Sequence, residues 1–145
     1  IETIYLPESL EEIGYSAFYE CLNLTSISIP SKITYLEDSL FEGCISLVNV
    51  ELNEGLEKIG KETFYSCSNL ESITLPSSLL LINSKAFYLC HNLFKVTNHS
   101  DLDILVGNNS NGYVGYYAYE VINVNGTNNY KYENYIRTDD DFIFI

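Results

Sequence analysis

The sequence repeats itself every 23 residues, and this period restricts the folds that are open to the chain. When it is written in rows of 23, single residue types fill whole columns: Cys21, Cys44, Cys67 and Cys90; Phe18, Phe41, Phe64 and Phe87; Leu24, Leu47, Leu70 and Leu93. Successive rows match without an insertion. A fixed period of this length predicts a solenoid, in which each unit buries its apolar face only by stacking on its neighbours.

The start of each row alternates apolar and polar residues. Ile27 and Ile29 flank Ser28, and Ile73 and Leu75 repeat the pattern two rows later. A period of two places the apolar side chains on one face of a short strand. Prolines end three of these segments and predict the ends of the strands, since proline donates no main-chain hydrogen bond: Pro7, Pro30 and Pro76.

The later part of each row changes to spacings of three and four, which predict a short helical turn. The residues that show these spacings in the first row are Ala17, Phe18, Cys21 and Leu24. Gly14 and Gly60 stand before this segment and predict a turn with unusual backbone angles. Each coil is therefore expected to contain a strand, a turn and a helical turn.

The combined unit L-x-x-I-x-L-P-x-x-L-x-x-I-G-x-x-A-F-x-x-C, clearest in Leu70 to Cys90, resembles the BspA-like, treponemal-type leucine-rich repeat. The resemblance implies an α/β fold: a right-handed solenoid with a parallel sheet on its concave face and short helical turns on its convex face. It also implies an extracellular or cell-surface location and a role in adhesion, and it implies no catalytic residues. The unit departs from commoner leucine-rich repeats because it lacks their asparagine ladder.

The period divides the chain into a solenoid of about four repeats, residues 1–97, and a non-repeating cap and linker, residues 98–145. Within the second part, apolar residues at offsets of three and four predict a helix over about 110–122. Residues 123–134 are polar and predict a linker. The strand-like end, residues 142–145, is expected to pair with about 132–137 and suggests a truncation from a longer protein.

Charge and hydropathy exclude two kinds of partner. The chain carries 7 basic and 20 acidic residues, a net charge of −13, which repels phosphate backbones and argues against nucleic acid. The longest apolar run, Leu79 to Ile82, is far below the roughly 20 residues of a membrane-spanning helix. We expect no direct membrane insertion by this chain, and we expect a monomer. Any signal or anchor is expected to lie outside the sequence.

The cysteines are expected to be buried free thiols. Equivalent side chains on neighbouring coils point the same way, whereas a disulfide needs them turned toward each other, and zinc needs four convergent ligands. Cys90 and His91 suggest a nucleophile and base, but residues in a core column and in a loop need not face each other. Asp139 to Asp141 is more typical of a solvated turn than of a calcium site. No catalytic residue, metal or cofactor is expected.

Binding is expected where side chains point away from the core. On the strands the candidate partner-binding residues are Tyr5, Ser26, Ser28, Asn49, Glu51, Ser72, Thr74 and Lys95. A column of tyrosines forms a second candidate surface: Tyr19, Tyr65 and Tyr88. Tyrosine suits partial exposure, so a structural role that covers the turns is the alternative for this column.

These features favour a non-catalytic, secreted or surface-exposed module that binds a protein or a glycan of unknown identity. One alternative is a structural spacer within a larger cell-surface protein. Another is a part of an enzyme whose active site lies elsewhere. No set of nucleophile, base and electrostatic stabiliser is recognisable in the sequence.

Overall fold

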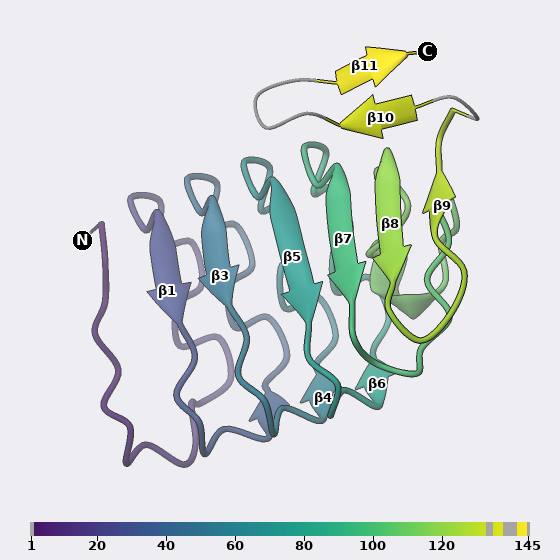
Figure 1. The fold of residues 1–145 in the computed structure, drawn as a ribbon. Coiled ribbons are helices and arrows are strands. Elements are labelled where there is room, and N and C mark those ends of the chain that lie inside the picture. Colours follow the sequence, from purple (N-terminus) through teal and green to yellow (C-terminus); the bar gives the residue numbers. More distant parts are fainter. Residues whose placement is uncertain (1, 133–134, 138–141, 145) are drawn as a thin grey trace.

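The computed structural model describes residues 2–132, 135–137 and 142–144. Its coils stack side by side, and each coil after the first adds one strand to a common front face (Figure 1). The parallel strands of this face are β1 (Ser26–Ser28), β3 (Asn49–Glu51), β5 (Ser72–Leu75), β7 (Lys95–Asn98) and β8 (Glu120–Asn123). Paired residues on neighbouring front strands from β1 to β7 are thus related by the 23-residue period of the sequence.

The register of the front strands follows the sequence columns. Ile27 pairs with Val50 and Ile73 pairs with Val96, so one row of buried side chains lies behind the front face. Hydrogen-bonded ladders join β1 to β3 and β5 to β7 to β8. Between β3 and β5 the described residues form no ladder, although Figure 1 shows the two strands side by side.

A second parallel sheet runs along the solenoid. It consists of β2 (Tyr35–Leu36), β4 (Lys58–Ile59) and β6 (Leu81–Ile82). Leu36, Ile59 and Ile82 are buried and occupy equivalent positions in the register. The apolar residues in the middle of each row therefore belong to a short second strand, and the core lies enclosed by the coil.

The helical turns predicted for each coil are absent from the part of the chain that the structure describes, where the helical segment is the single 3-10 turn η1 (Asn111–Tyr113). Alternate residues donate their main-chain N–H to the next coil: Phe18 to Leu40 O at 3.0 Å, Phe41 to Thr63 O at 2.8 Å and Phe64 to Ala86 O at 2.7 Å. The residues between them bond within their own turn, as Cys21 N does to Phe18 O. An α-helix is excluded because it needs every interior N–H for itself.

This alternation requires left-handed backbone at two positions in a coil. Ser16 and Glu20 have φ of 53° and 51°, and the equivalent Ser39 and Gly43 have 57° and 76°. The prediction that Gly14 and Gly60 supply the unusual angles is wrong, because neither has a positive φ. Gly60 instead provides space, since a Cβ there would lie 2.7 Å from the carbonyl oxygen of Leu36.

The phenylalanine column is the centre of the core. Phe41, Phe64 and Phe87 are fully buried, and each ring stacks on the next with centroids 5.3 and 5.0 Å apart. Phe18, on the first coil, stacks on Phe41 at 5.5 Å but is only partly buried. Each of these coils therefore contributes one phenylalanine ring to a continuous stack in the core, as the repeated column in the sequence predicts.

The helix predicted over about 110–122 is also wrong. This segment contains η1 and then β8, which pairs in parallel with β7. Val96 pairs with Val121 at a separation of 25 rather than 23 residues. The residues whose spacing suggests a helix thus belong to one further coil, which is two residues longer than the others. Because of these two extra residues, a search for a fixed period of 23 does not detect this coil.

The predicted linker, residues 123–134, includes an additional strand. β9 (Asn129–Tyr130) pairs antiparallel with β8 and completes the sheet on that side. The expected pairing near the end of the chain is confirmed in β10 (Tyr135–Arg137) and β11 (Phe142–Phe144), which pair antiparallel. Residues 133–134, 138–141 and 145 lie outside the described residues.

Two buried asparagines replace apolar residues in the last coils, whereas the regular repeats lack an asparagine ladder as the sequence indicates. Asn98 stands in the column of Leu52 and Leu75, and its Nδ2 donates to Asn123 Oδ1 at 2.8 Å and to Leu102 O at 2.7 Å. Asn123 Nδ2 donates to Ile104 O at 2.9 Å. The irregular connection after β7 buries carbonyl groups that need donors, and the amides supply them.

Truncation of the central ring is expected to destabilise the fold more than truncation of the end ring. Phe64→Ala leaves a cavity between two stacked rings and should lower the free energy of unfolding by about 3–5 kcal/mol. Phe18→Ala, in the same column but partly exposed, should cost clearly less. Urea denaturation followed by far-UV circular dichroism measures both, and equal losses would contradict the assignment of the column.

Asn98→Leu should destabilise the last coils, although it restores the apolar column. The change leaves Leu102 O and Asn123 Oδ1 without a donor in a buried setting, at about 1–3 kcal/mol for each group. The exposed Asn109→Leu is the control and should change stability by less than about 0.5 kcal/mol. Hydrogen exchange locates the effect, and unchanged protection of β7 and β8 would argue against the asparagine pair.

Candidate functional site

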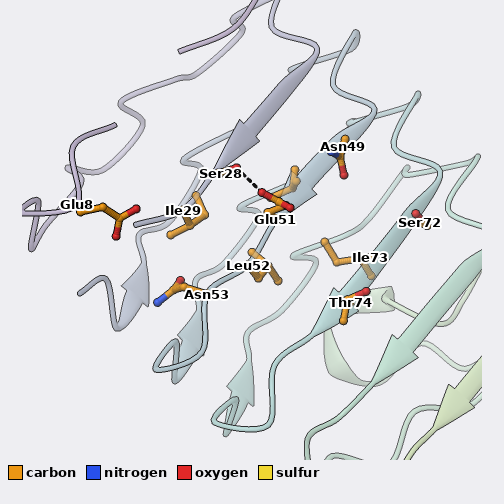
Figure 2. Close-up of a pocket in the computed structure, with 11 residues that line it drawn as sticks. Glu8, Ser28, Ile29, Asn49, Glu51, Leu52, Asn53, Ser72, Ile73 and Thr74 are labelled. Atoms are coloured by element: carbon orange, nitrogen blue, oxygen red, sulfur yellow. Dashed lines mark hydrogen bonds between the residues drawn. The ribbon is translucent and has the colours of Figure 1, made fainter. Parts of the chain in front are cut away.

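The front face carries an open groove of about 570 Å³ that is lined by residues of four successive coils. Polar side chains from β1, β3 and β5, from the segment that follows β3 and from the coil that precedes β1 surround it (Figure 2). We call this hollow the front groove. Its polar lining consists of Glu8, Ser28, Asn49, Glu51, Asn53, Ser72 and Thr74. The groove extends across the boundary between β3 and β5, where no hydrogen-bonded ladder joins the described strands.

Strand alternation explains why these side chains point outward. Val50 is 5 % exposed, whereas its neighbours Asn49 and Glu51 are exposed. Ser72 and Thr74 flank the buried Ile73 in the same way. Because successive side chains on a strand leave on opposite faces, burial of the apolar column places the polar column in the groove.

Two carboxylates give the front groove its charge. Ser28 Oγ donates to Glu51 Oε2 at 2.6 Å, a contact that Figure 2 shows. Ser31 donates to Glu8 Oε2 from Oγ at 3.0 Å and from its main-chain N at 3.2 Å. The part of the chain that the structure describes contributes no lysine, arginine or histidine to the groove. The groove is therefore negative and fits a ligand that donates hydrogen bonds.

Five of the predicted binding residues meet in this groove: Ser28, Asn49, Glu51, Ser72 and Thr74. Tyr5, which is 90 % exposed, and Ser26 line an adjoining hollow of about 460 Å³. Lys95 lies outside both hollows, on β7, where it is partly buried. Contact with a ligand remains a prediction for all of these residues.

Sequence reasoning missed Glu8 and Asn53. Asn53 replaces proline in the column that ends each strand, which was a visible signal. Its Nδ2 donates to Ile33 O at 2.9 Å, while its buried Oδ1 has no donor among the described residues. The sequence gives no comparable indication for Glu8, because nothing in its 23-residue repeat predicts that its side chain lies near β1 and β3.

The tyrosine column forms a surface separate from the front groove. Tyr65 and Tyr88 pack edge to face with centroids 5.5 Å apart, and Tyr88 continues to Tyr113 at 4.8 Å. Both are partly buried, whereas Tyr19 is 49 % exposed. The rings cover the turns of neighbouring coils, which agrees with the structural alternative for this column.

The cysteine column contains free thiols, and three of the four are buried as predicted, whereas Cys21 is only partly buried. Each buried thiol donates to the carbonyl oxygen of a phenylalanine in the preceding coil: Cys44 to Phe18 O at 3.1 Å, Cys67 to Phe41 O at 3.2 Å and Cys90 to Phe64 O at 3.0 Å. Burial raises the pKa of the Cys44 thiol to about 11 and raises that of Cys90 further. These groups stay protonated at neutral pH.

Cys90 and His91 do not act on each other. The Cys90 thiol points to Phe64 O, while the His91 ring packs against Tyr117 with centroids 5.2 Å apart. The described residues contain no group of three or more histidine, cysteine, aspartate or glutamate side chains that could hold a metal. The possible calcium site at Asp139 to Asp141 lies outside the described residues.

Stacked coils of regular length, each with a parallel front strand, define a leucine-rich-repeat solenoid. A family model described as a BspA type leucine rich repeat region matches residues 1–125 in six copies. The chain belongs to this family. The match extends past the point where the fixed 23-residue period ends.

Solved structures show the same fold. A leucine-rich-repeat protein of T. pallidum is 26 % identical, with a TM-score of 0.58 over 85 % of this chain and 70 % of that one. A leucine rich cell surface protein of Faecalibacterium prausnitzii is 30 % identical, with a TM-score of 0.57 over 59 % of this chain. A Bacteroides ovatus leucine-rich-repeat protein is also 30 % identical, with a TM-score of 0.50 over 67 % of this chain.

The chain spans about a fifth of the F. prausnitzii protein, 22 % of its length, and 37 % of the B. ovatus protein. No curated protein shows significant sequence similarity to it. Within the described residues, no helix has the length and apolar character needed to cross a membrane.

Thiol labelling should separate the first cysteine from the other three. In the native protein at pH 8, iodoacetamide should modify Cys21, while Cys44, Cys67 and Cys90 should react only in denaturant, because burial keeps them protonated and inaccessible. Mass spectrometry of the alkylated peptides measures this. Rapid native labelling of Cys67 would contradict the buried thiol column.

The raised thiol pKa also predicts a loss of stability in alkali. The pKa of Cys44 is about 11 in the folded chain against 9.0 for an ordinary thiol. The unfolded chain therefore loses its proton first, so the free energy of unfolding should fall as pH rises from about 9 toward 11. Cys44→Ala should remove part of this slope in urea titrations at several pH values, and an unchanged slope would contradict the prediction.

Proposed function

We propose that this chain is a non-catalytic, cell-surface interaction module that binds a basic, extended segment of a partner protein in its front groove. The observation that carries the proposal is the groove itself, which is open and polar and whose described lining includes Glu8 and Glu51 but no basic residue. The naming of the F. prausnitzii relative as a cell surface protein supports the location.

Charge complementarity supports a basic partner. The net charge of −13 attracts cationic segments over a distance, and the groove carboxylates then fix where they bind. The described groove residues include no tryptophan, tyrosine or arginine, the usual sources of tight binding at interfaces. Binding of modest affinity that weakens with salt is therefore expected.

Two other functions remain alternatives. A glycan could bind through the serine, threonine and asparagine side chains of the same groove, but neutral sugars make no use of its charge. A structural spacer would need no ligand at all. Both alternatives predict that removal of the groove carboxylates leaves peptide binding unchanged.

The test uses a fluorescein-labelled octalysine peptide and an octaserine peptide as probes, with fluorescence anisotropy as the readout. The double variant Glu8→Gln and Glu51→Gln should bind octalysine about tenfold more weakly, from two exposed ion pairs of up to about 1 kcal/mol each. The matched control is Glu12→Gln with Glu57→Gln, which changes the net charge equally with exposed residues outside the groove.

The control should lose much less affinity than the groove variant, and amide NMR shifts on octalysine addition should concentrate at β1, β3 and β5. Equal losses in the two double variants would show attraction to net charge alone and would contradict a defined site. Tight binding of octaserine by the parent and by both variants would contradict the requirement for a basic partner.

A further inference from the structure

A third hollow, of about 290 Å³, lies between the last two coils and differs in chemical character from the front groove. Aromatic side chains supply much of its lining. His91 and Phe94 come from the coil that leads into β7, and Tyr116, Tyr117 and Tyr119 come from the coil that leads into β8. Lys131, directly after β9, completes it.

The aromatic rings hold one another in place across the boundary between coils. The His91 and Tyr117 rings meet at 5.2 Å, and the Phe94 and Tyr119 rings meet at 4.9 Å. Tyr117 Oη also accepts a hydrogen bond from Leu89 N at 3.0 Å, which fixes the ring. These side chains are thus preorganised, which lowers the entropy lost when a ligand binds.

Charge distinguishes this cavity from the rest of the chain. Among the described residues, its lining includes Lys131 and His91 but no carboxylate, although acidic residues outnumber basic ones by 20 to 7 in the whole sequence. Lys131 Nζ lies 4.4 Å from the centroid of the Tyr119 ring, so the ammonium is held at the cavity by a cation–π contact. The main-chain N of Lys131 donates to Tyr119 O at 2.9 Å and anchors the residue.

We propose that this cavity binds one pyranose ring that carries a carboxylate, as in a uronic acid or a sialic acid residue of a glycan. The ring faces of tyrosine and histidine offer apolar surface to the C–H groups of the sugar, and Lys131 pairs with its carboxylate. The volume of about 290 Å³ lies just below the roughly 300–1,000 Å³ of pockets for drug-sized ligands, which suits a single ring.

Exposure favours a sugar over an apolar side chain of a protein. Tyr116 is 45 % exposed and the cavity is open on one side, so a ligand here keeps part of its surface in water. A sugar tolerates this because its hydroxyl groups remain hydrated while one face stacks. An apolar side chain gains most from complete enclosure, which this cavity does not provide.

The experiment titrates the protein with methyl β-D-glucuronide and, as the neutral counterpart, methyl β-D-glucoside, followed by saturation-transfer and amide NMR. The parent should bind the glucuronide about fivefold more tightly than the glucoside, the effect of one exposed charge pair. Shifts should appear at His91, Tyr117 and Lys131.

Two variants test the two halves of the site. Lys131→Met retains the aliphatic stem and should bind both sugars equally, whereas Tyr116→Leu should weaken both. The controls are Lys58→Met and Tyr15→Leu, at residues outside this cavity, and they should behave like the parent. Thermal melts of each variant verify folding.

Absence of shifts with either sugar would overturn the proposal, as would a preference for the glucuronide that survives Lys131→Met. Tighter binding of N-acetylphenylalanine amide than of either sugar would also overturn it and indicate a site for a protein side chain. The double variant Glu8→Gln and Glu51→Gln should leave sugar binding unchanged, so a failure of the front-groove proposal is distinguishable from a failure of this one.

Discussion

The structure depends on main-chain hydrogen bonds between successive coils. Most front strands, the second strands and the turns pair with the equivalent segment of a neighbouring coil, and this sets the distance between coils. Phenylalanine rings one coil apart then lie at 5.0–5.5 Å, close to stacking contact. A column must repeat its residue type because each member occupies the same environment as the one before it.

The turns show how strongly these bonds constrain the backbone. Serine, glutamate, lysine and leucine adopt positive φ there, which is unfavourable for residues with a Cβ. The conformation persists because it lets alternate N–H groups reach the next coil. The buried thiols of the cysteine column donate hydrogen bonds to carbonyl groups in the same turns. Cysteine thus fills a small apolar space and also supplies a hydrogen-bond donor.

A scaffold fixed in this way leaves its outward side chains available for binding. The front groove combines carboxylates with small polar side chains, whereas the cavity between the last coils combines aromatic rings with Lys131. The two surfaces differ in charge and in polarity. The two proposed sites therefore call for ligands of different chemistry.

The sequence by itself determined the solenoid, its period, the buried columns and the outward positions of Ser28, Asn49, Glu51, Ser72 and Thr74, because these follow from periodicity and strand alternation. The tertiary structure decided what no local pattern contains. Turns replaced helices because the N–H of residues such as Phe41 bonds to the next coil, and the coil ending in β8 kept its place in the sheet despite two extra residues. Glu8 lies at the front groove, and Lys131 lies near His91 and Tyr117, because neighbouring coils stack on one another. The spacing of residues in the sequence does not specify these distances between coils.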